Sequence, residues 1–554
     1  MGSPKFCASL PLLRSSNKMA DQKTKNETQV YTDVLCKIKS YLESKREIID
    51  AHNVDFFTQN LWEKCLPEGL RNDLDLLTQE ELSRLPSLYL YDDDENYEDS
   101  SCSELRKFLT EARSVQLSGI EFVRTRRGMG DGDLQMPLYM MTPKKSHEVS
   151  VMAHVVNQIA SQVKAEKVLD LGSGKGYLSQ ALALDYGLTV TGVDSKDMNT
   201  QNAVKRSMKL LKALQGRMRK ENKSHNMADD SSGRKDTKSA TICSKKSDIT
   251  EQTIDIMCVK DNPCGHFVHS DNKSPINMGL KSDLKEKCIS SSYTPITQYV
   301  DVSAFQSGDL FGLSTEDTDP RLVLVGLHTC GDLAPTAIKL FIGDESVKAL
   351  CLVGCCYHLL SQAGSGDIQG GDPGFPMSEY LQREKFTLSR NATMVAQQAA
   401  DKIATLSKLP PKSVFYRAVL QVILKEKFQL DTRGQHVGRI GSKCKTFHEY
   451  VKKGLSKLGL PFHKITDLEI EMYYERFQPE EKHILAFHQL RASMAPSIES
   501  LFIIDRLCFM KEQGFHDSSV VCLFDPVKSP RCYAIIANKE DVQTTEAHIA
   551  ESVS

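Results

Sequence analysis

Two short segments of the chain concentrate side chains that can accept a proton or attack carbon. They follow apolar runs at residues 322–327 and 347–353, which are typical of strands buried on both faces of a parallel sheet. Both segments therefore lie at predicted strand ends, and ligands of open α/β sheets bind beyond the carboxyl ends of the strands. We interpret five residues as candidate catalytic residues: His328, Cys330, Asp332, Cys356 and His358.

Three chemistries are open to these residues. His328 or His358 could accept a proton from an attacking hydroxyl, amine or imidazole, with Asp332 orienting the base. Cys356 could instead attack a nucleic-acid base as a thiolate. A zinc site is the third alternative, and its ligands would be Cys330, Cys355, Cys356 and His358. We favour the general base and predict no resident metal.

Residues 168–184 have the pattern of a strand, a ligand-binding turn and a helix. The apolar run at the start contains Asp170, and glycines follow at positions 172, 174 and 176. Glycine allows a sharp turn and lets a ligand approach bare backbone, while the free N–H groups of the next helix point at that ligand. The spacing Asp-x-Gly-x-Gly-x-Gly differs from the Gly-x-Gly-x-x-Gly pattern of dinucleotide-binding folds. It resembles the first motif of class I S-adenosylmethionine-dependent methyltransferases.

Two further acidic residues follow predicted strands. Asp194 ends the run 189–194, at the offset expected for a carboxylate that binds ribose hydroxyls. Asp301 ends the run 296–301, and we place it at the adenine edge. The predicted cofactor-binding residues are Asp170, Gly172, Ser173, Gly174, Gly176, Tyr177, Asp194 and Asp301.

A predicted helix begins at Pro143, and its first turn is basic. Its lysines oppose the helix dipole, which favours negative charge at that end. They could simply be solvated. In the functional interpretation, Lys144, Lys145 and His147 bind an anion, either the cofactor carboxylate or a substrate phosphate.

Apolar runs that alternate with helices predict a parallel sheet covered on both faces. Residues 519–524 and 532–537 flank a turn with two prolines and predict a closing antiparallel hairpin. We therefore predict an α/β fold of the class I methyltransferase type, with a Rossmann-like, mostly parallel seven-stranded sheet. Such a hairpin distinguishes this sheet from that of a dehydrogenase.

Apolar residues make up only 40% of the chain, which indicates a sizeable disordered part. We predict that folded and disordered segments alternate along the chain. Cys258, Cys264, His266 and His269 lack a paired Cys-x-x-Cys, so we do not interpret them as a zinc site. The predicted parts are a disordered N-terminus (1–27), a helical domain (28–115), the first half of the sheet domain (140–215), a disordered insertion (216–292), the second half (293–374), a helical insertion (375–514), the hairpin (515–540) and a disordered tail (541–554).

Composition bounds the partners and the compartment. The net charge of −2 indicates no global field for nucleic acid or membrane. No apolar run approaches the roughly 20 residues that span a bilayer. Sixteen cysteines without a disulfide framework suit a reducing compartment. We predict an intracellular protein of the cytoplasm or nucleus; the basic N-terminus leaves a mitochondrial address open.

Several segments together resemble one family, that of methyltransferase-like protein twenty-five. They are Lys144–Val149, Asp170–Leu178, Gly326–Ala334, Val353–Leu360, Gly374–Met377, Phe415–Gln421 and Asp525–Ala534. The resemblance implies a methyltransferase that uses S-adenosylmethionine. The His-x-Cys-Gly and Cys-Cys-x-His pieces also resemble the more distant tRNA 2′-O-methyltransferases of the acceptor stem. RNA is therefore slightly favoured as the macromolecular substrate; the alternatives are a protein methyltransferase and a non-catalytic, cofactor-binding scaffold.

Overall fold

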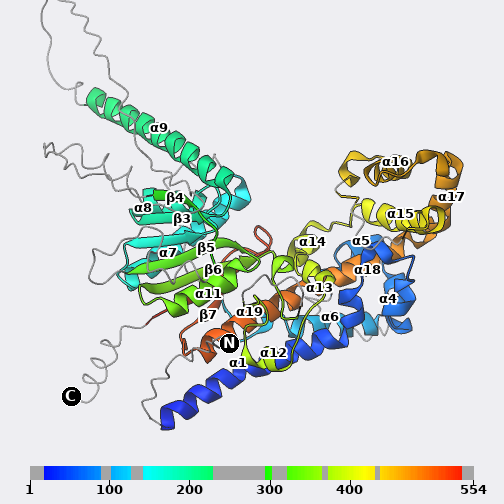
Figure 1. The fold of residues 1–554 in the computed structure, drawn as a ribbon, viewed down its shortest axis with the longest axis horizontal. Coiled ribbons are helices and arrows are strands. Elements are labelled where there is room, and N and C mark those ends of the chain that lie inside the picture. Colours follow the sequence, from blue (N-terminus) through cyan, green and yellow to red (C-terminus); the bar gives the residue numbers. More distant parts are fainter. Residues whose placement is uncertain are drawn as a thin grey trace, which may run out of the picture.

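The computed structural model describes residues 18–88, 102–125, 141–228, 293–301, 321–364, 372–430, 437–438 and 440–539. The disorder predicted for residues 1–17, 229–292 and 541–554 lies outside these ranges. The described part consists of a sheet covered by helices and an adjoining helical lobe (Figure 1). Within these ranges, no helix is both long enough and apolar enough to cross a membrane.

A twisted, mostly parallel sheet forms the centre of the first part. Its strand order is β1-β7-β8-β6-β5-β2-β3-β4, and only β8 runs antiparallel to its neighbours, β6 and β7. The predicted Rossmann-like sheet with a closing antiparallel hairpin is confirmed. The strands are β1 (Arg124–Thr125), β2 (Lys167–Leu171), β3 (Thr189–Asp194), β4 (Tyr293–Thr297), β5 (Leu322–Cys330), β6 (Val347–Cys355), β7 (Ser519–Cys522) and β8 (Tyr533–Asn538).

Two edge strands differ from the prediction. The sheet has eight strands rather than seven, because the two-residue β1 pairs with β7. A strand this short has no periodicity to detect. The second difference is β4, which occupies residues 293–297 instead of 296–301. It contains Pro295, which has no backbone N–H, and an edge strand tolerates this because it has no second neighbour that needs the missing donor.

Alternate strand residues pack against different helices, as the two-residue period of a strand requires. Val168 and Val323 belong to the core under α7 and α8, whereas Leu169 and Leu324 belong to the core that includes α11 and α19. Gln180 of α8 donates a hydrogen bond to the carbonyl of Ala203 in α9, at 3.1 Å. The helices around the sheet are α7 (Pro143–Gln162), α8 (Tyr177–Tyr186), α9 (Asp197–Ala228), α11 (Leu333–Gly343) and α19 (Ala495–Glu512).

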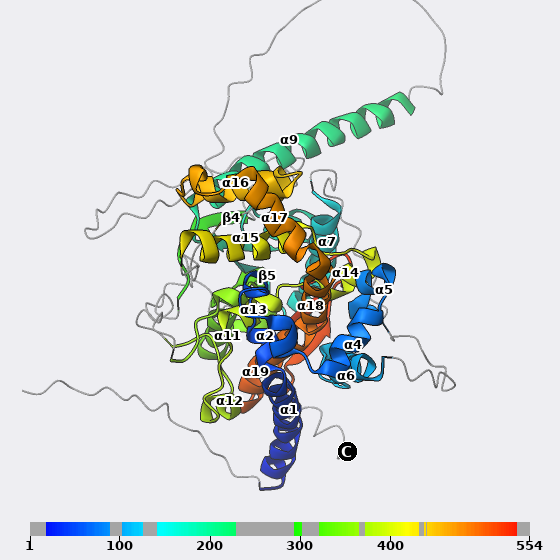
Figure 2. The ribbon, with the colours of Figure 1, turned by 90° about the vertical axis from the view of Figure 1, so that its right-hand side faces the viewer.

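The N-terminal and inserted helices form one helical lobe, in which α1 packs along α19 (Figure 2). Arg491 of α18 donates hydrogen bonds to the carbonyls of Ile48 and Ile49 and to the side chain of Asn53, at 2.7–3.1 Å. The lobe contains α1 (Lys18–Ser44), α2 (Arg46–Asp50), α3 (Leu61–Cys65), α4 (Glu68–Leu76), α5 (Gln79–Ser83), α6 (Ser103–Ser114), α12 (Glu379–Arg383), α13 (Arg390–Val395), α14 (Ala400–Leu406), α15 (Ser413–Phe428), α16 (Phe447–Lys457), α17 (Asp467–Phe477) and α18 (Glu481–Ser493).

Two helices extend into regions that we predicted to be disordered. Helix α1 begins at Lys18, although disorder was predicted to residue 27, and α9 continues to Ala228, past the predicted boundary at residue 216. Figure 1 shows α9 projecting away from the sheet. Both extensions contain Lys, Met, Ala and Glu, whose helix propensity is high even without an apolar stripe.

Candidate functional site

A cavity of about 820 Å³ opens at the carboxyl ends of β2, β3 and β5. This is the edge at which an open α/β sheet binds its ligand, and the volume suits a small molecule or cofactor. The predicted site residues that line it are Lys145, Asp170, Gly172, Ser173, Gly174, Tyr177, Asp194, His328, Cys330 and Asp332. Those that do not line it are Lys144, His147, Gly176, Asp301, Cys356 and His358.

The glycine turn presents bare backbone to the cavity. The N–H groups of Gly172 and Ser173 both donate to the carbonyl of Val193, at 2.8 and 3.0 Å, and this anchors the turn to β3. Gly174 has a left-handed φ of 59°. A Cβ atom there would meet only the carbonyl oxygen of Gly172, at 3.9 Å, so the space beside it is open. A ligand can approach the chain closely at this point.

Gly176 has a different role from the one that we predicted. A Cβ atom at this residue would lie 2.4 Å from the hydroxyl oxygen of Tyr293, which belongs to β4. Its φ is also left-handed, at 68°. Gly176 therefore makes room for the partly buried Tyr293, whose hydroxyl oxygen is buried behind the turn, and does not line the cavity.

Asp194 holds the turn in place. One of its carboxylate oxygens accepts a hydrogen bond from the N–H of Gly174 at 3.0 Å. The other accepts from the backbone of Lys196 at 2.9 Å and from the side chain of Asn199 at 3.0 Å. Because a carboxylate offers roughly four acceptor positions, about one remains for a ligand hydroxyl.

Asp170 is a buried carboxyl group that borders the cavity, with 1% of its surface exposed. Burial raises its pKa to about 7; the hydroxyl of Ser179, which donates to it at 2.6 Å, acts to lower the pKa, and the charge of Asp194 raises it further. The group is therefore close to half-ionised at neutral pH. A cationic ligand group would shift it to the carboxylate.

The candidate base His328 is oriented by a residue that the sequence analysis missed. Its Nε2 lies 3.3 Å from Oε2 of Glu148, which is 1% exposed in α7. The hydroxyl of Ser529 donates to Oε1 of Glu148 at 2.7 Å, and Nζ of Lys144 lies 3.5 Å from the same oxygen. Burial acts to raise the pKa of Glu148, but His328, Ser529 and Lys144 together lower it to about 2. The carboxylate stays charged and fixes the imidazole.

A signal for Glu148 was present in the sequence. It lies four and eight residues before the buried Met152 and Val156, on the apolar stripe of α7. An acidic residue on such a stripe needs a partner when the helix packs, because an unpaired buried charge is costly.

Asp332 does not orient His328, contrary to our prediction. It borders the cavity, but its Oδ1 accepts a hydrogen bond from the backbone N–H of Ser361 at 2.9 Å. The same oxygen packs closely against Gly374. Asp332 therefore holds the loop after β6 against the start of α11.

The three residues predicted to bind an anion separate in the structure. Lys145 faces the cavity, with Nζ 4.8 Å from the ring centre of Tyr177. Lys144 pairs with Glu148 instead. Nε2 of His147 accepts a hydrogen bond from the backbone of Asp525 at 3.2 Å, and its ring lies against Phe524 on the hairpin side of α7. The predicted anion-binding role is therefore left to Lys145.

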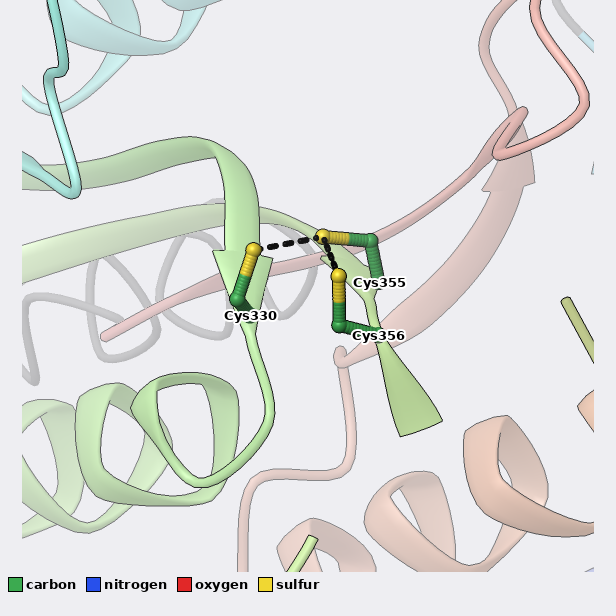
Figure 3. Close-up of side chains that lie close together, drawn as sticks. All are labelled: Cys330, Cys355 and Cys356. Atoms are coloured by element: carbon green, nitrogen blue, oxygen red, sulfur yellow. Dashed lines mark hydrogen bonds between the residues drawn. The ribbon is translucent and has the colours of Figure 1, made fainter. Parts of the chain in front are cut away.

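The cysteines at the ends of β5 and β6 form a cluster (Figure 3). The Sγ atoms of Cys330 and Cys355 lie 3.1 Å apart, and Sγ of Cys356 lies 3.7 Å from that of Cys355. The hydrogen bond from Cys355 is the main reason why the pKa of Cys330 falls to about 6. Burial, together with the neighbouring Cys330, raises the pKa of Cys356. Covalent attack by a Cys356 thiolate is therefore disfavoured.

Two other residues that we predicted to be part of the site, His358 and Asp301, lie outside it. His358 belongs to the short turn Tyr357–Leu359 and does not join the cysteine cluster. Asp301 is exposed, four residues beyond the end of β4. Residues 298–300 of the same segment line the cavity instead. We took Asp301 as the end of the strand because it follows an apolar run. The strand β4 in fact starts and ends earlier, at residues 293–297.

Comparisons with known proteins agree with this geometry. A family model described as "Methyltransferase domain" matches residues 144–363, which contain α7, the glycine turn and both Cys/His segments. A mouse (Mus musculus) protein named "Probable methyltransferase-like protein 25" is 33% identical over 588 residues, covering 92% of this chain and 96% of the relative. A human (Homo sapiens) protein of the same name is 32% identical over 587 residues, covering 90% and 96%.

Proposed function

The chain belongs to the methyltransferase-like protein 25 family, and on this premise we propose that it is an S-adenosylmethionine-dependent methyltransferase acting on a macromolecule, with RNA favoured over protein. The observation that carries the proposal is the cavity, in which the carboxyl groups of Asp170 and Asp194 flank the bare backbone of the glycine turn. When bound, the cofactor would supply an electrophilic methyl group on its sulfonium.

The residues present fit such a cofactor. Asp170 would hold its cationic amino group, because a bound cation would lower the raised pKa of this carboxyl and so stabilise its carboxylate form. The remaining acceptor position of Asp194 would take a ribose hydroxyl. The open side of Gly174 would let the cofactor lie against the backbone.

His328 would accept the proton that the methyl acceptor loses. Glu148 engages Nε2 of the imidazole, which leaves Nδ1 for the acceptor. Glu148 is thus a positioning residue that keeps the ring oriented and supports positive charge on it. Methyl transfer is a displacement at carbon, so alignment of the acceptor and its correct protonation are what this chain contributes.

RNA is favoured by the lining of the cavity. Lys145, Lys175 and Lys196 all border it, and lysines bind phosphates without reading sequence. Tyr299 also borders the cavity and is 72% exposed. An exposed aromatic ring among lysines can stack on an unpaired base.

A methyl-transfer assay with the purified full chain tests this function. Tritiated cofactor is supplied with either total RNA or total protein from cells that lack the chain. We expect label in RNA, and we expect His328→Asn to lower its incorporation by about 100-fold or more while cofactor binding persists. Label in protein alone would select the protein methyltransferase. No label in either fraction, with a folded protein that binds the cofactor, would select the non-catalytic scaffold.

A further inference from the structure

Three cysteine thiols converge at the rim of the cavity, and their placement follows from the sheet. Cys330 and Cys355 are the last residues of β5 and β6 and are register partners in the parallel ladder. Partners on neighbouring strands project their side chains from the same face. Figure 3 shows their sulfur atoms side by side, with Cys356 completing the group. The three Sγ atoms all lie within 4.8 Å of one another.

Cys356 reaches this group because its backbone is left-handed. Successive side chains of an extended strand point to opposite faces, so the residue after Cys355 would otherwise point away. At φ 53° and ψ 47°, Cys356 turns back toward Cys355. This conformation is strained for a residue other than glycine. The surrounding structure holds it, and its effect is to bring a third sulfur atom to the other two.

A buried positive charge lies behind the cluster. Arg506 of α19 is 2% exposed and packs against Gly354, next to Cys355. Among the described residues, its Nη2 has no hydrogen-bond partner. The positive charge of Arg506 would compensate a cluster of three deprotonated sulfurs, whose net charge around a divalent ion is −1.

We propose that Cys330, Cys355 and Cys356 bind one soft divalent ion, Zn²⁺ or an ion of similar chemistry. In tetrahedral zinc sites a Zn–S bond of about 2.3 Å places the sulfurs about 3.8 Å apart. The Sγ atom of Cys355 lies 3.1 Å from that of Cys330 and 3.7 Å from that of Cys356, and no two of the three sulfurs are more than 4.8 Å apart. These separations bracket the value for zinc. Thiolates select zinc over the hard ions magnesium and calcium, and the three thiols release their protons to solvent on binding.

The fourth position of such an ion belongs to a ligand from outside the described residues. Within the ranges that the structure describes, no fourth His, Cys, Asp or Glu joins the group. Three protein ligands with one open position are typical of catalytic zinc sites rather than structural ones. Because Cys330 borders the cavity, that position is at the cavity rim, open to water or to a donor atom of the substrate.

From the sequence alone we favoured a general base and no resident metal, although the side chains of this group are of the kind that binds zinc. The sheet supplies the missing proximity: two ligands come from neighbouring strand ends, and the third from a left-handed turn. The proposed site is independent of methyl transfer.

Cobalt substitution tests the site directly. The full chain is reduced, stripped of metal with a chelator and titrated with Co²⁺ alone. We expect saturable binding with intense sulfur-to-cobalt charge-transfer absorption, which Zn²⁺ abolishes by displacement. Cys355→Ala and Cys356→Ala should each lose this absorption. Cys351→Ala, a buried thiol on the same strand outside the cluster, should keep it. The double variant of Cys258 and Cys264 should also keep it.

Other results would overturn the site. Absence of the absorption in the folded parent chain refutes it, and so does its survival in a folded Cys355→Ala chain. A loss of two hydrogens under mild oxidation, without cobalt binding, would identify Cys330 and Cys355 as a redox pair instead. Cofactor binding by the metal-free chain is measured in parallel, so that failure of this site and failure of the proposed function remain distinguishable.

Discussion

His328 and Glu148 meet at 3.3 Å although 180 residues separate them in the chain. The histidine comes from near the end of β5 and the glutamate from the second turn of α7, which covers that face of the sheet. Ser529, from the turn of the closing hairpin, donates to the same carboxylate. Three distant segments therefore fix one imidazole at the cavity, and the charge of Glu148 contributes to folding as well as to orientation.

The buried charge of Glu148 should make stability fall in acid. Its folded-state pKa is lowered from 4.5 to about 2, so its contribution is present above pH 4.5 and is lost as the pH falls toward 2. With allowance for solvent screening, the charged form should contribute about 2 kcal/mol. Urea unfolding of the wild type and Glu148→Gln should show the wild type's advantage shrinking as the pH falls from 4.5 to about 2. Parallel pH curves would contradict this.

The stability that Asp170 contributes should depend on pH with the opposite sign. Its folded-state pKa is raised from 3.8 to about 7, so the stability that it contributes is present below pH 3.8 and is lost as the pH rises through 7. Without cofactor, Asp170→Asn should be more stable than the wild type at about pH 8, by up to about 4 kcal/mol, and close to it in acid. The same unfolding series measures both residues. A variant that is less stable at pH 8 would refute the buried carboxyl as described.

Two glycines separate backbone strain from crowding. Gly187 and Gly176 both have left-handed φ values, but a Cβ atom at Gly187 meets nothing within 4 Å, whereas one at Gly176 meets the Tyr293 hydroxyl oxygen at 2.4 Å. We expect Gly187→Ala to cost about 1 kcal/mol from strain alone. Gly176→Ala should cost about 1–3 kcal/mol more, because the Tyr293 ring must move. Thermal unfolding measures both, and equal losses would mean that Tyr293 yields freely.

Neighbouring lysines should differ in RNA binding. Lys145 borders the cavity, whereas Lys144 pairs with Glu148. If RNA is the substrate, Lys145→Gln should weaken binding and reduce the salt slope by about one phosphate contact, and Lys144→Gln should have a smaller effect on both. Fluorescence anisotropy with a structured RNA over a range of salt concentrations measures the slopes. Unchanged affinity and slope in Lys145→Gln would remove this lysine from the substrate path.

Local sequence was sufficient for much of the fold. The strand, turn and helix over residues 168–184 are predictable because an apolar run, three glycines and a second apolar run are all local signals. The hairpin of β7 and β8 is predictable for the same reason, with its turn marked by Pro526 and Pro530. The cavity then follows from a general rule of open α/β sheets.

The parts that escaped prediction depend on packing between distant segments. His147 and Glu148 are adjacent, and the sequence alone did not show which of them faces the site. The partner of each comes from beyond residue 320. The fit of Tyr293 behind Gly176 joins segments on either side of a long insertion. Apolar periodicity identified the N-terminal and inserted helices, but it carries no information on which helices pack together.

Calorimetric titration with S-adenosylmethionine at about pH 8 tests the central claim most directly. We predict saturable binding by the wild-type chain. We also predict at least about tenfold weaker binding by Asp170→Asn, the loss expected when a charge-assisted hydrogen bond is removed, although this variant should be the more stable one without ligand. The surface variant Asp372→Asn, on a side chain that is 83% exposed, should bind as the wild type does. No binding by the folded wild type at hundreds of micromolar, or equal binding by Asp170→Asn, would contradict the account.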